Sequence, residues 1–195
     1  MTKMARTDSQ DLLDPRDELV THLGVLRAFA LSLCRNPSTA DDLVQETVMK
    51  AWKSIASFEQ GTNMRAWLFT ILRNTYYTAH RKSAREISDT DGHFAATLSV
   101  KPDHDGKLAM TDFMVAFDQL PDEQREALTL VGASGFAYHE AAEMCGVATG
   151  TMKSRVNRAR LRLVELLDLS GDDSMELTDK GTMAVLTSHL PVRRT

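Results

Sequence analysis

Apolar residues recur at intervals of three and four along most of the chain, and no stretch shows the strict alternation of a β-strand. The first such run predicts a helix over about 15–34, with these residues on one face: Leu19, Leu23, Leu26, Ala30 and Leu33. Asn36-Pro37 interrupts the pattern, and Ser38 followed by Asp41 resembles a capping box at the start of a second helix. The periodicity therefore predicts an all-α fold.

A polar stretch over residues 83–108 divides the helical pattern into two parts. It carries several acidic residues together with Gly92, Pro102 and Gly106, as a linker does. Helical spacing resumes after it with Met110 and Phe113. We expect an N-terminal extension (1–14), a small helical domain (15–84), a flexible linker (85–108), a second helical domain (109–168) and a C-terminal tail (169–195).

The segment 138–167 has the pattern of a helix-turn-helix. Cys145-Gly146-Val147 forms the predicted turn, where glycine adopts a left-handed conformation without a Cβ clash. The helix that follows has an apolar face of Met152, Val156, Ala159, Leu163 and Leu166. Its opposite face carries Thr151, Lys153, Ser154, Asn157 and Arg158, with Arg155, Arg160 and Arg162 on the flanks. In a helix-turn-helix this second helix enters the major groove of DNA.

The charge of the chain sharpens this interpretation. The sequence has 23 Lys and Arg against 27 Asp and Glu, yet residues 153–162 contain five basic residues and no acidic one. A basic helix in an acidic chain favours DNA binding. The alternative is a structural helix whose charged face is simply solvated.

A third helix, expected over Met64–Lys82, is also basic. No acidic residue lies between Asn63 and Arg85. One face is predicted to be buried and gathers Trp67, Leu68, Ile71, Leu72, Thr75 and Ala79; the opposite face carries Arg73, Asn74, Tyr77 and Arg81. Positive charge beside an exposed aromatic ring and an amide suits single-stranded DNA. The alternative is that the aromatic residues Trp67 and Tyr76 are ordinary core residues, and for Trp67 this interpretation is preferred.

The second helix begins with an acidic and polar patch of Asp41, Asp42, Gln45 and Glu46. DNA would be repelled by these carboxylates, so a docking face for a protein is expected, although the helix dipole alone also favours acidic residues here. The buried side of this helix is predicted to hold Leu43, Val44, Thr47, Val48, Ala51, Trp52 and Ile55. Residues 58–63 are expected to form a loop around Gly61.

Several function classes lack support in the sequence. No apolar run approaches the roughly 20 residues needed to cross a bilayer, and the first residues do not resemble a signal peptide. Cys34 and Cys145 are interpreted as reduced packing thiols of a cytoplasmic protein, with a disulfide as the alternative. The six histidines show no metal-ligand spacing, and no P-loop, nucleophile elbow or zinc motif is found. We expect no enzyme activity, metal or cofactor.

These segments together resemble the extracytoplasmic-function, or group IV, sigma factors of bacterial RNA polymerase. ADDLVQETVMKAWKSIASFE (Ala40–Glu59) and MRAWLFTILRNTYYTAHRK (Met64–Lys82) resemble sigma region 2. DQLPDEQREALTLVGASGFAYHEAAEMCGVATGTMKSRVNRARLRL (Asp118–Leu163) resembles region 4. Ala141 replaces a branched aliphatic residue found in many members, and the sequence around it is similar to the branch that controls the alphaproteobacterial general stress response.

The resemblance implies a role for each surface. The patch of Asp41, Asp42, Gln45 and Glu46 is expected to dock on the β′ clamp helices of core polymerase, with further contacts to the β subunit. The promoter −10 element is expected to contact Asn63, Arg73, Asn74, Tyr77 and Arg81, with the loop 58–63 holding a flipped base. The −35 element is expected to contact Thr151, Lys153, Ser154, Arg155, Asn157 and Arg158. The resemblance also implies a small anti-sigma protein as a partner, and no membrane association.

Two alternatives remain at this stage. One is a helix-turn-helix regulator that acts without polymerase, which would need a dimerisation or effector domain. The other is a sigma-like mimic that captures the anti-sigma protein. A mimic has no need of basic DNA-binding faces, so the sequence favours the sigma factor itself.

Overall fold

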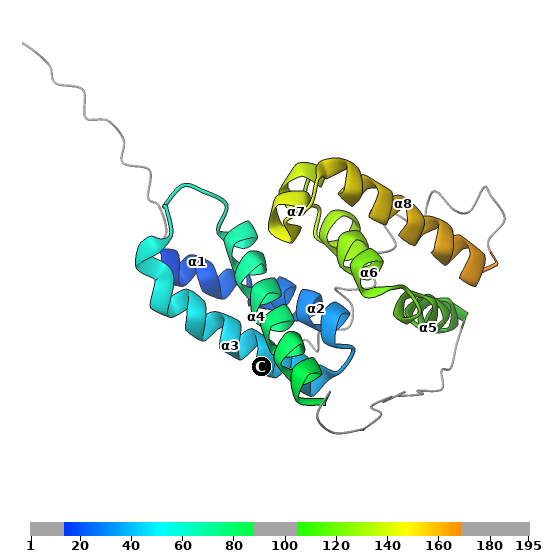
Figure 1. Cartoon of the computed structure of the whole chain (residues 1–195), viewed down its shortest axis with the longest axis horizontal. Coiled ribbons are helices and arrows are strands. Elements are labelled where there is room, and N and C mark those ends of the chain that lie inside the picture. The colour runs from blue at the N-terminus through cyan, green and yellow to red at the C-terminus, as the bar shows by residue number, and fades with distance from the viewer. Residues whose placement is uncertain (1–13, 88–104, 169–195) are drawn as a thin grey trace, which may run out of the picture.

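The computed structural model describes residues 14–87 and 105–168 of the chain, which form two packed helical modules (Figure 1). The first module comprises α1 (Pro15–Thr21), α2 (Leu23–Cys34), α3 (Pro37–Ser54), the 3-10 turn η1 (Ile55–Ser57) and α4 (Met64–Ile87). The second module comprises α5 (Asp105–Asp118), α6 (Asp122–Leu128), the π-helical turn η2 (Thr129–Ala133), α7 (Tyr138–Cys145) and α8 (Thr149–Leu166). No strand occurs in these described ranges, and the all-α prediction is confirmed. None of their helices has the length and apolar composition of a membrane span.

The first predicted helix is divided at His22. The His22 amide donates to the Leu19 carbonyl at 3.1 Å, and the His22 carbonyl accepts from the Leu26 amide at 3.0 Å. The division lets α1 contact α4 while α2 pairs with α3. The prediction of one continuous helix over 15–34 was wrong here, because apolar spacing does not distinguish a continuous helix from two consecutive ones.

The start of α3 also differs from the prediction. Asn36 is the N-cap, and its Oδ1 accepts a hydrogen bond from the Thr39 amide at 3.0 Å. Pro37 occupies the first helical position, where its missing N–H costs nothing. The start signal assigned to Ser38 was therefore misplaced by two residues.

The core of the first module follows the predicted faces except at Ala79 of α4, which is exposed, and at Trp52. Trp52, expected on the buried side of α3, is 50% exposed. Its ring lies under the guanidinium of Arg16 on α1, 5.3 Å from ring centroid to Cζ. The large apolar ring is therefore covered by a cation rather than by core side chains.

α4 extends beyond its predicted end at Lys82, as far as Ile87. The outer parts of the predicted linker are helical, since residues 85–87 belong to α4 and residues 105–108 to α5. The rest of that prediction (88–104), most of the N-terminal extension (1–13) and the tail (169–195) lie outside the described residues.

The helix-turn-helix is formed as predicted. Gly146 has φ +65°, and the amide of Val147 donates to the Ala142 carbonyl at 3.0 Å, which closes the end of α7. α7 and α8 pack together through Ala141, Ala142, Met152 and Val156, all of which are buried. Gly135, with φ +69°, follows the end of η2 at Ala133.

The two modules share one hydrophobic core. Phe69 of α4 stacks on Phe29 at a centroid distance of 4.7 Å and meets Phe136 of the second module edge-on at 5.0 Å. Arg125 of α6, 1% exposed, donates across the boundary to the Ser32 carbonyl at 2.6 Å. α2 and α6 lie side by side (Figure 1), and α4 contacts α7. The chain is thus closed on itself.

Candidate nucleic-acid interface

The polar face of α8 is open to solvent. Thr151, Lys153, Asn157 and Arg158 are exposed, and Ser154 is half-buried with its hydroxyl donating to the Thr151 carbonyl at 2.9 Å. The opposite face of α8 is anchored by buried apolar residues: Met152, Val156, Ala159 and Leu163. This division agrees with the predicted faces and leaves a row of donors available to DNA.

Arg155 differs from its neighbours on α8. Its Nη2 lies 2.8 Å from Oε2 of Glu123 on α6, and its side chain is only 16% exposed. This ion pair stays within the second module. Arg155 is therefore placed to fix α8 against α6, which sequence reasoning did not foresee.

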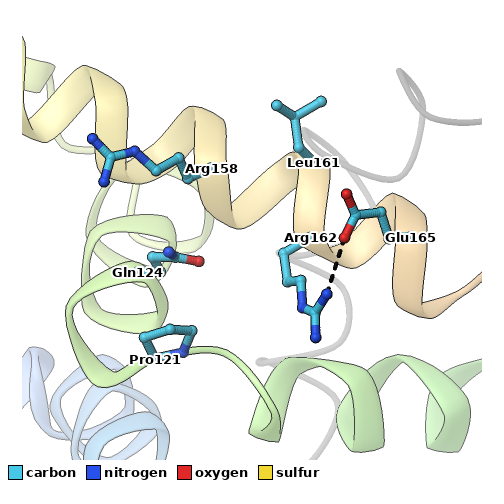
Figure 2. Close-up of a pocket in the computed structure, with 6 residues that line it drawn as sticks. All are labelled: Pro121, Gln124, Arg158, Leu161, Arg162 and Glu165. Atoms are coloured by element: carbon cyan, nitrogen blue, oxygen red, sulfur yellow. Dashed lines mark hydrogen bonds and ion pairs between the residues drawn. The ribbon is translucent and has the colours of Figure 1, made fainter.

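A hollow of about 330 Å³ lies between α6 and α8 (Figure 2). One side is lined by Gln124 of α6 and its N-cap residue Pro121, and the other by four residues of α8: Arg158, Leu161, Arg162 and Glu165. Leu161 is 57% exposed. The hollow adjoins Arg158, so the outer surface of the second module combines basic and apolar groups.

The basic face of α4 is divided between solvent and the second module. Asn74 and Arg81 are exposed, as predicted. Arg73 instead has its Nε 2.8 Å from Oε1 of Glu126, and the Tyr77 hydroxyl donates to Oε2 of the same carboxylate at 3.2 Å. The expectation of an exposed aromatic at Tyr77 was therefore wrong in the closed chain, because α6 covers it.

The electrostatics of this contact favour the ion pair. Burial opposes the charge on Arg73, but the adjacent Glu126 carboxylate outweighs it and raises the pKa of the guanidinium. Burial and the same carboxylate raise the pKa of the Tyr77 hydroxyl, so it stays protonated and remains a donor. The Arg73 guanidinium also lies 4.6 Å from the Tyr77 ring centroid.

The loop 58–63 forms where it was predicted, with Gly61 at φ +87°. Its last residue has two roles. Asn63 Oδ1 accepts from the Ala66 amide at 3.0 Å and so caps α4, while its Nδ2 donates to Glu140 Oε1 of α7 at 3.3 Å. Both polar groups of the Asn63 side chain, which is expected to contact DNA, are thus already engaged in hydrogen bonds within the chain.

The acidic patch on α3 is partly neutralised. Asp41 Oδ1 accepts from Arg27 Nε at 2.6 Å, and this hydrogen bond lowers the pKa of the Asp41 carboxyl. Glu46 Oε1 lies 2.7 Å from Lys50 Nζ. Asp42 and Gln45 are exposed, and the described part of the chain gives Asp42 no ion-pair partner. Asp42 is thus the most available charge of the four predicted docking residues.

A shallow apolar groove of about 580 Å³ lies beside this patch, between α2 and α3. Its lining residues are Leu23, Gly24, Arg27, Val44, Gln45, Val48 and Met49. Met49 is 59% exposed. Sequence reasoning assigned only the charges of this face; the apolar groove depends on how α2 pairs with α3.

The two cysteines agree with their interpretation as reduced packing residues. Both Cys34 and Cys145 are free. Burial raises the pKa of Cys34 to about 11 and that of Cys145 to about 12, so neither forms a reactive thiolate at neutral pH.

Comparison with known proteins assigns both modules. Residues 19–86 match the model of Sigma-70 region 2, and residues 111–163 match that of Sigma-70, region 4. The chain is 53% identical over 156 residues to the ECF RNA polymerase sigma factor EcfG of Rhodopseudomonas palustris (strain TIE-1), which covers 80% of this chain and 86% of that protein.

Two solved structures are similar to this chain. The sigma factor RpoE, crystallised with the anti-sigma factor NepR from Bartonella quintana, is 52% identical with a TM-score of 0.72, and the match covers 80% of this chain and 97% of that one. A chain of the PhyRSL–NepR complex from Sphingomonas sp. Fr1, at 19% identity and a TM-score of 0.58, shares the fold over 81% of this chain and 92% of that one. The sequence patterns, the two modules and these matches converge: the chain belongs to the extracytoplasmic-function sigma factors of RNA polymerase and is similar to the EcfG group.

Proposed function

We propose that this chain binds core RNA polymerase and directs it to promoters by reading their −35 and −10 elements. The observation that carries the proposal is the exposed basic face of α8, presented on the second helix of a helix-turn-helix in a chain with sigma regions 2 and 4. The function is recruitment and strand recognition rather than catalysis, and needs no cofactor.

The −35 element is read as duplex DNA by α8. Lys153 and Arg158 supply cations for phosphates or guanine edges, and Asn157 supplies a paired donor and acceptor suited to adenine. Thr151 and Ser154 add hydroxyl contacts. Arg155 acts through its ion pair with Glu123, which holds the helix in place.

The −10 element is bound as a single strand along α4. Asn74 and Arg81 are accessible in the closed chain, while Asn63, Arg73 and Tyr77 become available once the second module moves away. The loop 58–63 holds a base flipped out of the stack, at a cost of roughly a few kcal/mol that a shaped pocket offsets.

Polymerase docks on the other side of the first module. Asp42 and Gln45 are free to contact the basic β′ clamp helices, with Asp41 and Glu46 exchanging their present partners or acting beside them. The neighbouring apolar groove adds area that charges alone do not supply. The β subunit makes further contacts with the chain in this proposal.

The likeness to RpoE bound to NepR supports a small anti-sigma protein as a regulator of this chain. The similarity to EcfG supports a role in a stress response in the cytoplasm. Such a partner would compete with polymerase for the docking surfaces of the two modules.

Run-off transcription tests the proposal. Core polymerase is incubated with a library of genomic fragments, with and without the chain, and the 5′ ends of the transcripts are sequenced. Transcripts that depend on the chain and share −35 and −10 elements are expected. DNA binding without such transcripts would instead support an independent regulator, and capture of an anti-sigma protein without either activity would support a mimic.

A further inference from the structure

The carboxylate of Glu126 is buried between the two modules. The residue is 1% exposed, and both of its oxygens are engaged by α4. Oε1 accepts from Arg73 Nε at 2.8 Å, and Oε2 accepts from the Tyr77 hydroxyl at 3.2 Å. A carboxylate accepts the same charge-assisted hydrogen bonds as a DNA phosphate. Glu126 therefore satisfies the groups that are proposed above to bind the −10 strand.

The contact continues along one stripe of α4. Arg65, Phe69, Arg73 and Tyr77 recur every fourth residue and therefore share a face of the helix. Arg65 donates to the Ser134 carbonyl, and its guanidinium lies 4.7 Å from the Phe136 ring centroid. Each member of the stripe thus contacts the second module.

We propose that the second module masks this stripe in the free chain, and that Glu126 is an internal substitute for the −10 strand. The inference rests on the proposed function. Arg73 and Tyr77 cannot bind Glu126 and DNA at once, so the closed chain and the −10 complex exclude each other. In the free chain, the second module therefore prevents the α4 stripe from binding single-stranded DNA.

The composition of the contact makes such opening feasible. Arg73 and Glu126 would both return to water on separation, so neither is left as an unpaired buried charge. The rim is polar as well: Arg35 of the first module donates to Oδ1 of Asp122 on α6 at 2.9 Å. The boundary also contains the apolar contact of Phe69 with Phe136, and the exposure of these rings on separation opposes opening. A partner that binds the modules separately would shift the population toward the open form.

The isosteric change Glu126→Gln removes the charge while keeping the volume of the side chain. Glu143→Gln is a matched control, because Glu143 is an exposed carboxylate of the same module, on α7, away from the contact with α4. The full-length chain and both variants are compared in two ways. Small-angle X-ray scattering gives the radius of gyration, and fluorescence anisotropy gives the affinity for a labelled pool of random single-stranded DNA 12-mers.

Glu126→Gln is expected to increase the radius of gyration and to bind the DNA pool about three- to tenfold more tightly, because affinity scales with the fraction of open chain. The control is expected to match the parent in both measurements. Equal radii for all three proteins, or a parent already as expanded as Glu126→Gln, would overturn the masking. Expansion without tighter DNA binding would uphold the masking and refute the −10 role of the α4 stripe.

A second variant guards against misfolding. Tyr77→Phe removes a single hydrogen bond to Glu126 and leaves the ion pair in place. Circular dichroism checks that each variant keeps its helices. If Glu126→Gln is unfolded, the radius of gyration of Tyr77→Phe decides: a smaller but measurable expansion supports the masking, and no expansion overturns it.

Discussion

Both α8 and α4 carry a basic, polar face, but the two faces differ in how accessible they are in the structure. On α8, Lys153, Asn157 and Arg158 are exposed. On α4, Arg73 and Tyr77 contact Glu126 from the other module. The sequence of a helix thus indicates that its basic face can bind DNA. Whether that face is exposed depends on residues far away in the sequence, such as Glu126 for α4.

The largest expected effect concerns the buried contact that joins the modules. Arg125→Met would remove the donor that serves the Ser32 and Leu120 carbonyls at 2.6 and 3.0 Å. Leaving these buried acceptors unsatisfied should lower the free energy of unfolding by about 3 kcal/mol. Urea denaturation followed by circular dichroism measures the loss.

Arg35→Met is the matched control for this change. Arg35 also spans the two modules, but it is exposed and lies at the rim. Arg35→Met should lower the free energy of unfolding by under about 1 kcal/mol, since exposed ion pairs contribute little to stability. Equal losses for the two variants would show that the buried part of the boundary is no stronger than its rim.

The next effect tests the open face directly. Arg158→Ala should reduce transcription from a −35-dependent promoter about tenfold, because a good base contact contributes roughly 1–3 kcal/mol of discrimination. Affinity for core polymerase should not change. Arg162→Ala, one turn along α8 and paired with Glu165 at 3.0 Å, serves as the control and should retain activity. Parallel loss of polymerase binding in Arg158→Ala would refute its role in DNA reading.

The acidic patch gives an intermediate effect. Asp42→Arg should weaken binding to core polymerase about tenfold, since it replaces an attractive contact with a repulsive one. Biolayer interferometry with immobilised polymerase measures the change. Asp17→Arg, an exposed reversal on α1 outside the patch, should bind normally. Unchanged affinity for Asp42→Arg would reject this docking face.

The smallest effect concerns the turn that positions α8. The Cβ added by Gly146→Ala would meet no atom within 4 Å. The change should therefore lower the free energy of unfolding only through the strain of the left-handed backbone at φ +65°, by about 1 kcal/mol. Gly150→Ala is the control, because Gly150 lies in the first turn of α8 with ordinary helical backbone and its Cβ would also meet open space. It should stabilise the chain by about 0.5–1 kcal/mol. A thermal melt of each variant resolves the opposite signs.

Residues adjacent in the sequence were enough to predict many local features of the fold. The turn at Gly146, the faces of α8 and the loop around Gly61 depend on residues adjacent in sequence, and the structure has them where expected. The errors at Ser38 and His22 are also local. Asn36 and Pro37 form a stronger start signal than Ser38, and apolar spacing does not distinguish one continuous helix from two consecutive ones.

The state of the α4 face was not predictable in the same way. Its partner, Glu126, lies 49 residues after Tyr77, and nothing local links the two positions. One signal was present: Phe69 and Tyr76 lie outside the single predicted apolar face, and a helix that is apolar on more than one side is typically buried on more than one side. Phe69 is indeed fully buried, against both Phe29 and Phe136.

Arginine modification of the free chain tests the central comparison most directly. The chain is treated briefly with phenylglyoxal, and mass spectrometry follows the rate at each arginine. Arg158 should react quickly, while Arg73, 19% exposed and bonded to Glu126, should be protected. Reaction of Arg73 as fast as that of Arg158 would contradict the account, because it would mean that the α4 face is as open in solution as the α8 face.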